Sequence, residues 1–321
     1  MIYRKMQGTA LTVSAVAMGS ALFGATYSED FAFEQLDLFA EYGGNLIDTA
    51  HVYNDWIEGE RSRSEKVIGR WLASRGMRDH MIVLTKGAHP PMEDMLHSRV
   101  TRGDIRRDIS ESLENLGLDR IDLYLLHRDD VKKPVGEIVG WMNELIDEGI
   151  VRYWGCSNWT TARMAEANGY AAVHGLQGMR CNQTMWSLAT IRREGLADRT
   201  LEPLDRAGYD YHRTTGMNLM AFTSQAKGYF PRLEAGEALP PDMLAVYGTP
   251  VNAAKLEVLK GISRKTGLSM AELSLAFFLK QPFVAIPVVA YDNHELLRAG
   301  LNTYRPEVEA LLPRLDFETV F

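Results

Sequence analysis

The chain has 321 residues, of which 46% are hydrophobic and 24% are charged, and its formal net charge is −7. This balance is typical of a globular protein, and the length allows two domains or one large α/β barrel. The negative charge argues against a general nucleic-acid binder. Two cysteines without a CxxC spacing predict neither a disulfide framework nor a metal site. We therefore expect a cytoplasmic protein, because this cysteine usage suits a reducing compartment.

The N-terminal residues 10–25 are apolar and small, and Arg4 and Lys5 precede them. This pattern imitates a signal peptide, but Thr, Ser and Gly interrupt the apolar run. An interior strand explains the stretch better. No stretch approaches the ~20 apolar residues of a membrane span, so we expect no membrane partner.

Short apolar runs rich in Val, Ile, Leu and Met recur along the chain and predict strands. Most of them are nearly continuous rather than alternating, which is typical of parallel strands that are buried on both faces. The predicted strands are 13–20, 45–50, 81–86, 121–127, 151–157, 179–186, 217–223 and 284–289.

Stretches with helical periodicity lie between these strands. Strand and helix alternate eight times, which predicts one (β/α)8 barrel domain over residues 1–321, with its active site at the C-terminal face of the strands. Two long irregular stretches, 87–101 and 227–249, are expected at that face. The predicted helices are 30–42, 64–74, 102–116, 134–149, one capped by Thr160 or Thr161, a weaker one at 196–207, 250–267, 269–279, 295–301 and 306–312.

Polar side chains stand at the predicted C-terminal ends of successive strands. The second strand ends at Asp48, with Tyr53 just beyond it, the third ends at Lys86, and the fourth ends at His127. Because these ends converge on one mouth of a barrel, the four side chains are expected to share a pocket. The sequence contains no GxGxxG, GxxxxGK[ST], HExxH or GxSxG motif.

Each of the four residues has a possible role in carbonyl reduction. Tyrosine ionises near pH 10 and is a poor acid at neutral pH, but a neighbouring lysine ammonium is expected to lower the pKa of Tyr53. Asp48 could keep Lys86 charged and oriented, and His127 could orient a carbonyl group and donate to its oxygen. Taken singly, each residue also has an ordinary structural explanation as a turn, packing or surface residue.

Several linked motifs resemble the aldo-keto reductase family. They are NLIDTAHVY, SEKVIGRWL, IVLTKG, LGLDRIDLYLLHRDD, EGIVRYWGCSNW and CNQTMWSL, and the similarity extends from about residue 2 to residue 302. The resemblance implies a (β/α)8 barrel that transfers hydride between NADP(H) and a carbonyl or alcohol without a metal. It also implies that Asp48, Tyr53, Lys86 and His127 form the catalytic tetrad, with Tyr53 as the general acid–base.

The resemblance further implies a set of cofactor contacts. Ser157, Asn158 and Gln183 match residues that hydrogen-bond the nicotinamide carboxamide, although Ser157 and Asn158 could instead cap the next helix. Phe222 falls where the family usually stacks an aromatic ring on the nicotinamide. The candidates for pyrophosphate contacts are Thr223, Gln225, Lys227 and Gly228.

The chain departs from the family's pattern after the eighth strand, where the adenosine 2′-phosphate and the adenine are usually held. The usual glutamine or arginine is Leu296, and the usual asparagine is Gly300. Asp292 adds negative charge where a phosphate is expected, which is unfavourable unless Arg298 offsets it. Use of NAD(H) is therefore possible beside NADP(H).

Aromatic and charged residues near the predicted mouth suggest a polar or sugar-like substrate, because rings stack on C–H faces and acids accept from hydroxyl groups. An alternative is that residues 128–130 form only a solvated turn. A regulatory subunit resembling the potassium-channel β-subunits is another possible function, as is a glycosidase that uses Asp48 with Asp129 or Asp130. The substrate candidates are Trp56, Arg128, Asp129 and Trp186, with Trp159 and Phe230 as further possibilities.

Overall fold

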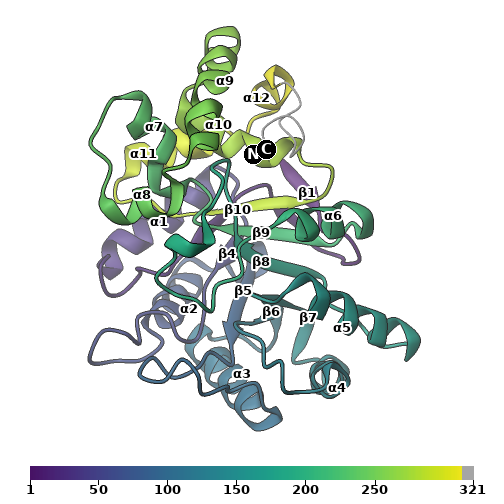
Figure 1. Ribbon diagram of the computed structural model, residues 1–321. Helices are drawn as coiled ribbons and strands as arrows, with labels where there is room; N and C mark the ends of the chain where they lie inside the picture. The colour runs from purple at the N-terminus through teal and green to yellow at the C-terminus, as the bar shows by residue number, and fades with distance from the viewer. Residues whose placement is uncertain (313–321) are drawn as a thin grey trace.

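The computed structural model describes residues 1–312, and its centre is a closed barrel of eight parallel strands (Figure 1). Strands that follow one another in the chain are neighbours, and the last strand pairs with the first. The strands are buried on both faces, which explains their nearly continuous apolar sequences and confirms the predicted fold class. The barrel strands are β3 (Ala17–Gly19), β4 (Leu46–Asp48), β5 (Ile82–Gly87), β6 (Ile121–Leu126), β7 (Val151–Ser157), β8 (Cys181–Met185), β9 (Asn218–Phe222) and β10 (Ala285–Val289).

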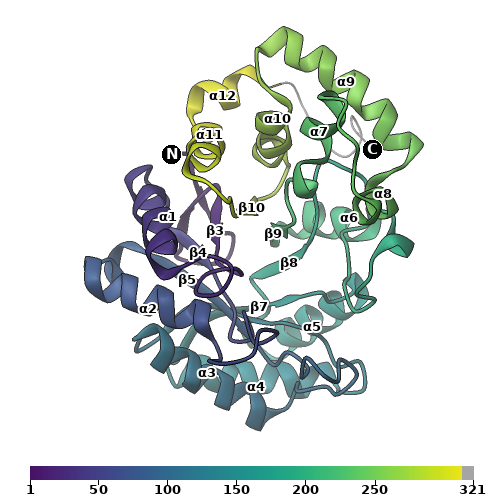
Figure 2. The same ribbon diagram turned by 90° about the vertical axis from the view of Figure 1, so that its left-hand side faces the viewer.

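Helices surround the strands, as the view in Figure 2 shows. Side-chain caps begin many of them; for example, the Thr160 hydroxyl accepts from the Arg163 N–H. No helix among residues 1–312 is both long and apolar enough to cross a membrane. The α-helices are α1 (Glu29–Glu41), α2 (Arg63–Arg75), α3 (Arg102–Leu116), α4 (Val135–Asp147), α5 (Thr161–Val173), α6 (Arg206–Thr215), α7 (Tyr229–Glu234), α8 (Pro241–Tyr247), α9 (Pro250–Thr266), α10 (Met270–Ala276), α11 (His294–Asn302) and α12 (Pro306–Leu311).

The N-terminal residues form an antiparallel hairpin of β1 (Tyr3–Lys5) and β2 (Thr12–Ser14). The predicted strand 13–20 is therefore wrong as one element, because its start belongs to β2 and its end to β3. The Ser14 hydroxyl donates to the Val16 carbonyl oxygen at 2.7 Å and stabilises the turn between the two strands. The hairpin residues Met6, Leu11 and Val13 are buried against the side chains that fill the barrel interior.

The hairpin lies at the N-terminal end of the barrel. Its Gln7 N–H donates to the side chain of Asn218, the first residue of β9, and its Ala10 N–H donates to the hydroxyl of Tyr153 near the start of β7. The hairpin thus covers this end, and the opposite, C-terminal end remains for a functional site.

Two other predicted segments differ from the structure. The predicted helix 196–207 is mostly irregular, and α6 begins only at Arg206, because Pro203 disfavours a helix interior and Asp205 caps the helix through the Gly208 N–H. Residues 227–249, expected to be irregular, contain the short helices α7 and α8. Of residues 87–101, expected to be irregular, Gly87 ends β5 and residues 88–101 contain neither helix nor strand.

Candidate active site

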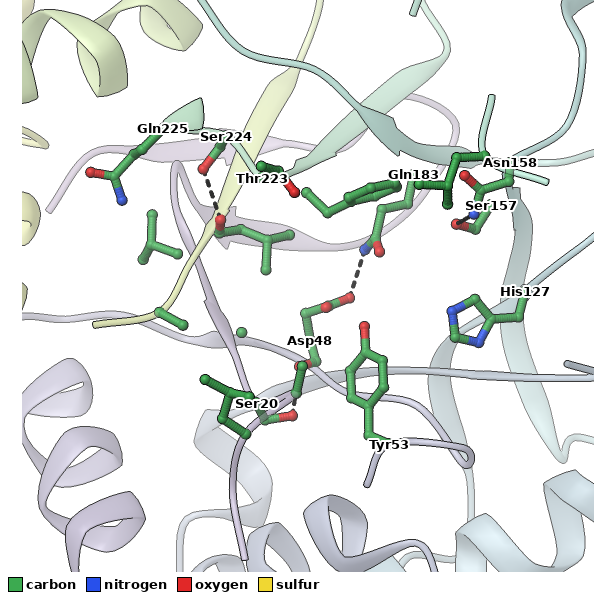
Figure 3. A pocket seen from close by; sticks show the side chains of 18 of the residues that line it. Ser20, Asp48, Tyr53, His127, Ser157, Asn158, Gln183, Thr223, Ser224 and Gln225 are labelled. Atoms are coloured by element: carbon green, nitrogen blue, oxygen red, sulfur yellow. Dashed lines mark hydrogen bonds between the residues drawn. The ribbon is translucent and has the colours of Figure 1, made fainter. Parts of the chain in front are cut away.

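The C-terminal ends of β4, β5 and β6 bring Asp48, Lys86 and His127 to one mouth of the barrel. Asp48 ends β4, Lys86 is the penultimate residue of β5, and His127 directly follows β6. Tyr53 lies in the turn after β4, where its N–H donates to the Ala50 carbonyl oxygen. Because parallel strands end on the same side, residues far apart in the chain meet here (Figure 3).

Lys86 is the centre of the hydrogen-bond network in this site. Its Nζ lies 2.9 Å from Asp48 Oδ1, 2.9 Å from the Tyr53 hydroxyl oxygen and 2.7 Å from the Thr49 carbonyl oxygen. An ammonium group has three N–H donors, so these three contacts satisfy it completely. The side chain is fully buried, and its position is therefore fixed.

The pKa of Tyr53 shifts in the opposite direction to the one expected from the sequence. Burial raises the pKa of the Tyr53 hydroxyl, and although Lys86 acts to lower it, the net direction is upward. The expected lowering by Lys86 is thus outweighed, because the phenol lies in a poorly hydrated site and Asp48 also disfavours the phenolate. Tyr53 consequently stays protonated at neutral pH and retains a proton to donate.

Lys86 itself remains charged in this buried site. Burial acts to lower the pKa of its ammonium, but Asp48 and Tyr53 more than offset this effect, so the pKa is raised. A permanent cation therefore lies within hydrogen-bonding distance of the phenol oxygen, where negative charge develops when the proton leaves.

His127 is held as a neutral imidazole. Burial lowers the pKa of its ring well below the ordinary value, and His89, Lys86 and Arg128 add to this effect. Its ring packs edge-on against Tyr53 and His89, with centroids 6.0 and 4.8 Å away. The buried His127 Nδ1 has no hydrogen-bond partner within residues 1–312, so ring packing contributes to its orientation. The sequence patterns did not indicate the role of His89, which lies in an irregular loop.

A cavity of about 610 Å³ opens above Tyr53. Among the residues that line it are Ser157, Asn158 and Gln183, together with the ring of Phe222. The Gln183 amide donates to Asp48 Oδ1 at 2.6 Å, which joins this polar group to the Lys86 network (Figure 3). Thr160 rather than Ser157 or Asn158 caps α5, so neither side chain is taken up by helix capping.

The segment that follows β9 has an unusual backbone. Thr223, Ala226, Lys227 and Gly228 have φ values of 52°, 49°, 55° and 78°. The Ala226 N–H donates to the Thr223 carbonyl oxygen and the Gly228 N–H donates to the Gln225 carbonyl oxygen, so the segment forms two successive tight turns. Thr223, Gln225 and Lys227 line the first cavity, and so does Ser224, which the sequence analysis missed.

A second cavity of about 700 Å³ shares Gln225, Lys227 and Ala290 with the first, so the two are adjacent. Gly228 lines only the second. Three cationic side chains face this second cavity, and they are Lys227, Arg232 and Arg305.

The structure places Asp292 and Arg298, which were predicted as cofactor contacts, outside the lining of both cavities. Both residues are exposed and line neither of these two cavities of residues 1–312. Asp292 directly precedes Asn293, which caps α11, and Arg298 lies within that helix. The charged residues that line the second cavity are instead the cations Lys227, Arg232 and Arg305 and the carboxylates Glu237 and Glu272.

The predicted substrate residues are separated in the structure. Trp56 is 46% exposed and its ring centroid lies 6.3 Å from that of Tyr53, so it stands at the rim of the mouth. Arg128 lines the first cavity and pairs with Asp198 at 3.1 Å.

Asp129 and Trp186, which were predicted as substrate contacts, do not line the first cavity. The Asp129 carboxylate is bound by Arg163 at 2.9 Å. Trp186 is 2% exposed and packs against Phe277 and Phe278, because its side chain points away from the mouth into the layer between strands and helices. Trp159 and Phe230 are also buried.

Comparison with known proteins finds one family that matches nearly the whole chain. The sequence profile of the aldo/keto reductase family matches residues 15–309. The chain is 29% identical to the aldo-keto reductase ausK of Emericella nidulans, over 99% of this chain and 83% of that protein. It is 26% identical to norsolorinic acid reductase B of Dothistroma septosporum, over 100% of this chain and 83% of that protein.

A third relative is the aryl-alcohol dehydrogenase GME11368 of Pestalotiopsis microspora, which is 27% identical over 94% of this chain and 76% of that protein. The family match covers far more than half of the chain and agrees with the closed eight-stranded barrel. This chain belongs to the aldo/keto reductase family of NAD(P)H-dependent oxidoreductases.

Proposed function

We propose that this protein catalyses the reversible reduction of a carbonyl group to an alcohol, with NADP(H) as cofactor and Tyr53 as the general acid–base. The observation that carries the proposal is the buried Lys86 ammonium, which contacts both the Tyr53 hydroxyl and Asp48 beneath the first cavity. A phenol held against a permanent cation is a proton donor whose conjugate base is stabilised in advance.

Each of the four side chains has a distinct part in the reaction. In the direction of reduction, Tyr53 donates its proton to the carbonyl oxygen as that oxygen gains charge. Lys86 stabilises the resulting phenolate, and Asp48 keeps Lys86 charged and in place. The neutral His127 hydrogen-bonds the same substrate oxygen and orients it. The nicotinamide cofactor, when bound, supplies the hydride to the carbonyl carbon.

The residues of the two cavities fit a nicotinamide dinucleotide. Ser157, Asn158 and Gln183 offer hydroxyl and amide groups for the carboxamide, and Phe222 offers a flat face for the ring. The segment 223–228 would hold the pyrophosphate with its left-handed turn and Lys227. Arg298 and Asp292 would remain outside these contacts.

The adenosine end supports NADPH as the preferred cofactor. In the lining of the second cavity the three cations Lys227, Arg232 and Arg305 outnumber the two carboxylates Glu237 and Glu272, and Asp292 does not add to the negative charge there. Leu296 and Gly300 still lack the polar groups that the family usually places there, which leaves NADH as the alternative. Titration of the purified protein with each cofactor decides between them: tighter binding of NADH would contradict the preference.

The identity of the substrate rests on fewer residues than the cofactor does. Arg128 in the cavity and Trp56 at its rim support the predicted polar or sugar-like carbonyl compound. An aromatic carbonyl compound is the second candidate, because Leu22, Leu201 and Phe222 line the cavity. Two relatives are named for norsolorinic acid and for an aryl alcohol, and these names also favour an aromatic substrate.

A substrate panel of aldoses, keto-sugars and aromatic aldehydes separates these two candidates, with oxidation of NADPH followed by absorbance. Turnover of the aromatic aldehydes alone would remove the sugar-like class.

The Tyr53→Phe variant tests the catalytic proposal. We expect a loss of reduction by at least about 10²-fold, with NADPH binding retained, because the variant removes only the proton donor. Tyr170→Phe is a matched control, since this tyrosine lies on α5 and stacks on His174. Unchanged turnover in Tyr53→Phe would refute the assigned role. Cofactor binding without turnover of any substrate in the wild-type protein would instead favour a regulatory subunit.

A further inference from the structure

At the edge of the second cavity, the Tyr291 phenol fills the space that a side chain at residue 300 would otherwise take. Gly300 is a buried residue within α11. A Cβ atom at this position would lie 2.2 Å from the Tyr291 hydroxyl oxygen and 2.8 Å from its Cζ. Such distances are far shorter than van der Waals contact, so the phenol can take this position only because residue 300 has no side chain.

Tyr291 also contacts the segment that we assign to the pyrophosphate. It lies two residues after the end of β10, and its hydroxyl donates to Gln225 Oε1 at 3.2 Å. Gln225 lines both cavities, whereas Tyr291 lines only the second. The phenol therefore links α11 to the segment 223–228, directly beside the passage from one cavity to the other.

The side of the second cavity formed by α10 and α11 suits a flat heteroaromatic ring, whereas charged side chains such as Arg232 and Arg305 contribute other parts of the wall. Ala271 and Leu275 of α10 and Leu296 and Ala299 of α11 contribute aliphatic surface. Thr303 Oγ1, a buried hydroxyl in the lining of this cavity, has no hydrogen-bond partner within residues 1–312. Aliphatic walls, an aromatic ring and a free hydroxyl together match the faces and edge of a purine.

We propose that Tyr291 forms the adenine-contacting wall of the cofactor site, in the place that a side chain at residue 300 would otherwise take. This inference rests on the proposed function, because it takes the ligand to be a nicotinamide dinucleotide. The Tyr291 hydroxyl is directed to Gln225, so the base is held mainly by its face rather than by an amide at its edge. Stacking of this kind is tolerant of the identity of the base.

Binding titrations test the inference without turnover. Stacking of a base on an aromatic side chain corresponds to roughly 5- to 150-fold in affinity. We therefore expect Tyr291→Ala to raise the Kd of NADPH by an amount in that range. The Kd of reduced nicotinamide mononucleotide, which lacks adenosine, should be unchanged and serves as the internal control. Tyr291→Phe should lose only a few-fold, because it keeps the ring.

The crowding between the two positions provides a second measurement. Gly300→Asn alone should weaken NADPH binding, since the new side chain displaces the phenol. In the double variant Tyr291→Ala/Gly300→Asn, the Asn occupies the vacated space, and the Kd should be lower than in either single variant. Tyr291→Leu keeps a large side chain but has no aromatic face. Its Kd for NADPH tests the same expectation if the alanine variant does not fold.

The outcomes separate this inference from the proposed function. If the wild type binds NADPH and both Tyr291→Ala and Tyr291→Leu bind it equally well, the assignment of Tyr291 is overturned and the proposed function stands. If the wild type binds neither NADPH nor NADH, the proposed function fails and the inference fails with it. A parallel loss for the mononucleotide would also overturn the inference, because it would mean that the substitutions act on the whole site.

Discussion

Replacement of Lys86 by Met separates the structural role of the buried charge network from its catalytic role. The Lys86 Nζ and Asp48 Oδ1 atoms are 2.9 Å apart, and both side chains are almost completely buried. At an effective dielectric constant of ~20, a charge pair at this distance of 2.9 Å attracts by about 6 kcal/mol before desolvation is counted. Within residues 1–312, Lys86→Met leaves the buried Asp48 carboxylate with the Gln183 amide as its remaining side-chain donor.

The expected loss in the free energy of unfolding is about 3–5 kcal/mol, because one partner of a buried pair has been removed. The double variant Asp48→Asn/Lys86→Met should recover most of this loss, since no unpaired charge remains. Activity should behave differently. Both variants lack the cation beside Tyr53 and should lose about 10²–10³-fold in kcat, as is typical when a preorganised charge is removed.

Urea unfolding followed by tryptophan fluorescence gives the stabilities, and steady-state reduction of a substrate found in the panel gives kcat. Lys86→Arg is a useful control that keeps the charge but changes its geometry. Equal stability of the single and double variants would refute the view that Asp48 is left unpaired, and recovery of kcat in the double variant would refute the catalytic role of the cation.

Three further predictions follow from other contacts. His89→Ala should lower kcat about 5- to 10-fold and leave the Kd of NADPH unchanged, because ring packing of about 1 kcal/mol orients His127. His89→Phe keeps an aromatic ring and should restore most of the lost kcat. An equal loss of kcat in both variants would contradict packing as the cause. Burial lowers the pKa of His212 to about 4, so the unfolded state binds this proton first and the free energy of unfolding should decrease as pH falls from about 6.5 to about 4. Urea titrations at several pH values check this, and His212→Asn should show a shallower decrease. Gly155→Ala should destabilise the barrel by several kcal/mol in urea unfolding, because its Cβ would lie 2.0 Å from the Cys181 carbonyl oxygen. Gly140→Ala, which has open space around it, is the control and should stabilise α4 by about 0.5–1 kcal/mol in the same measurement.

The separated substrate residues show where a strand-end argument fails. Asp48, Lys86 and His127 lie at the C-terminal ends of three neighbouring strands, so the barrel itself brings them to one mouth. Trp186 also follows a strand end, but its ring packs among the helices, because alternation of side chains and the course of the next loop decide which way it points. Tyr291 and Gly300 could not be paired from the sequence, since their contact depends on how α11 packs after the turn that follows β10.

The pattern of buried runs and intervening helices by itself determined the barrel, since a strand that is buried on both faces leaves a continuous apolar run in the sequence. The order of polar residues at the strand ends then placed Asp48, Tyr53, Lys86 and His127 at one mouth. Only the tertiary structure decided the N-terminal hairpin, the contact of His89 with His127 and the upward pKa of Tyr53. Each of these features depends on how segments that are remote in the chain pack against one another. The distances between their side chains, and the degree to which those side chains are buried, cannot be read from the local sequence pattern.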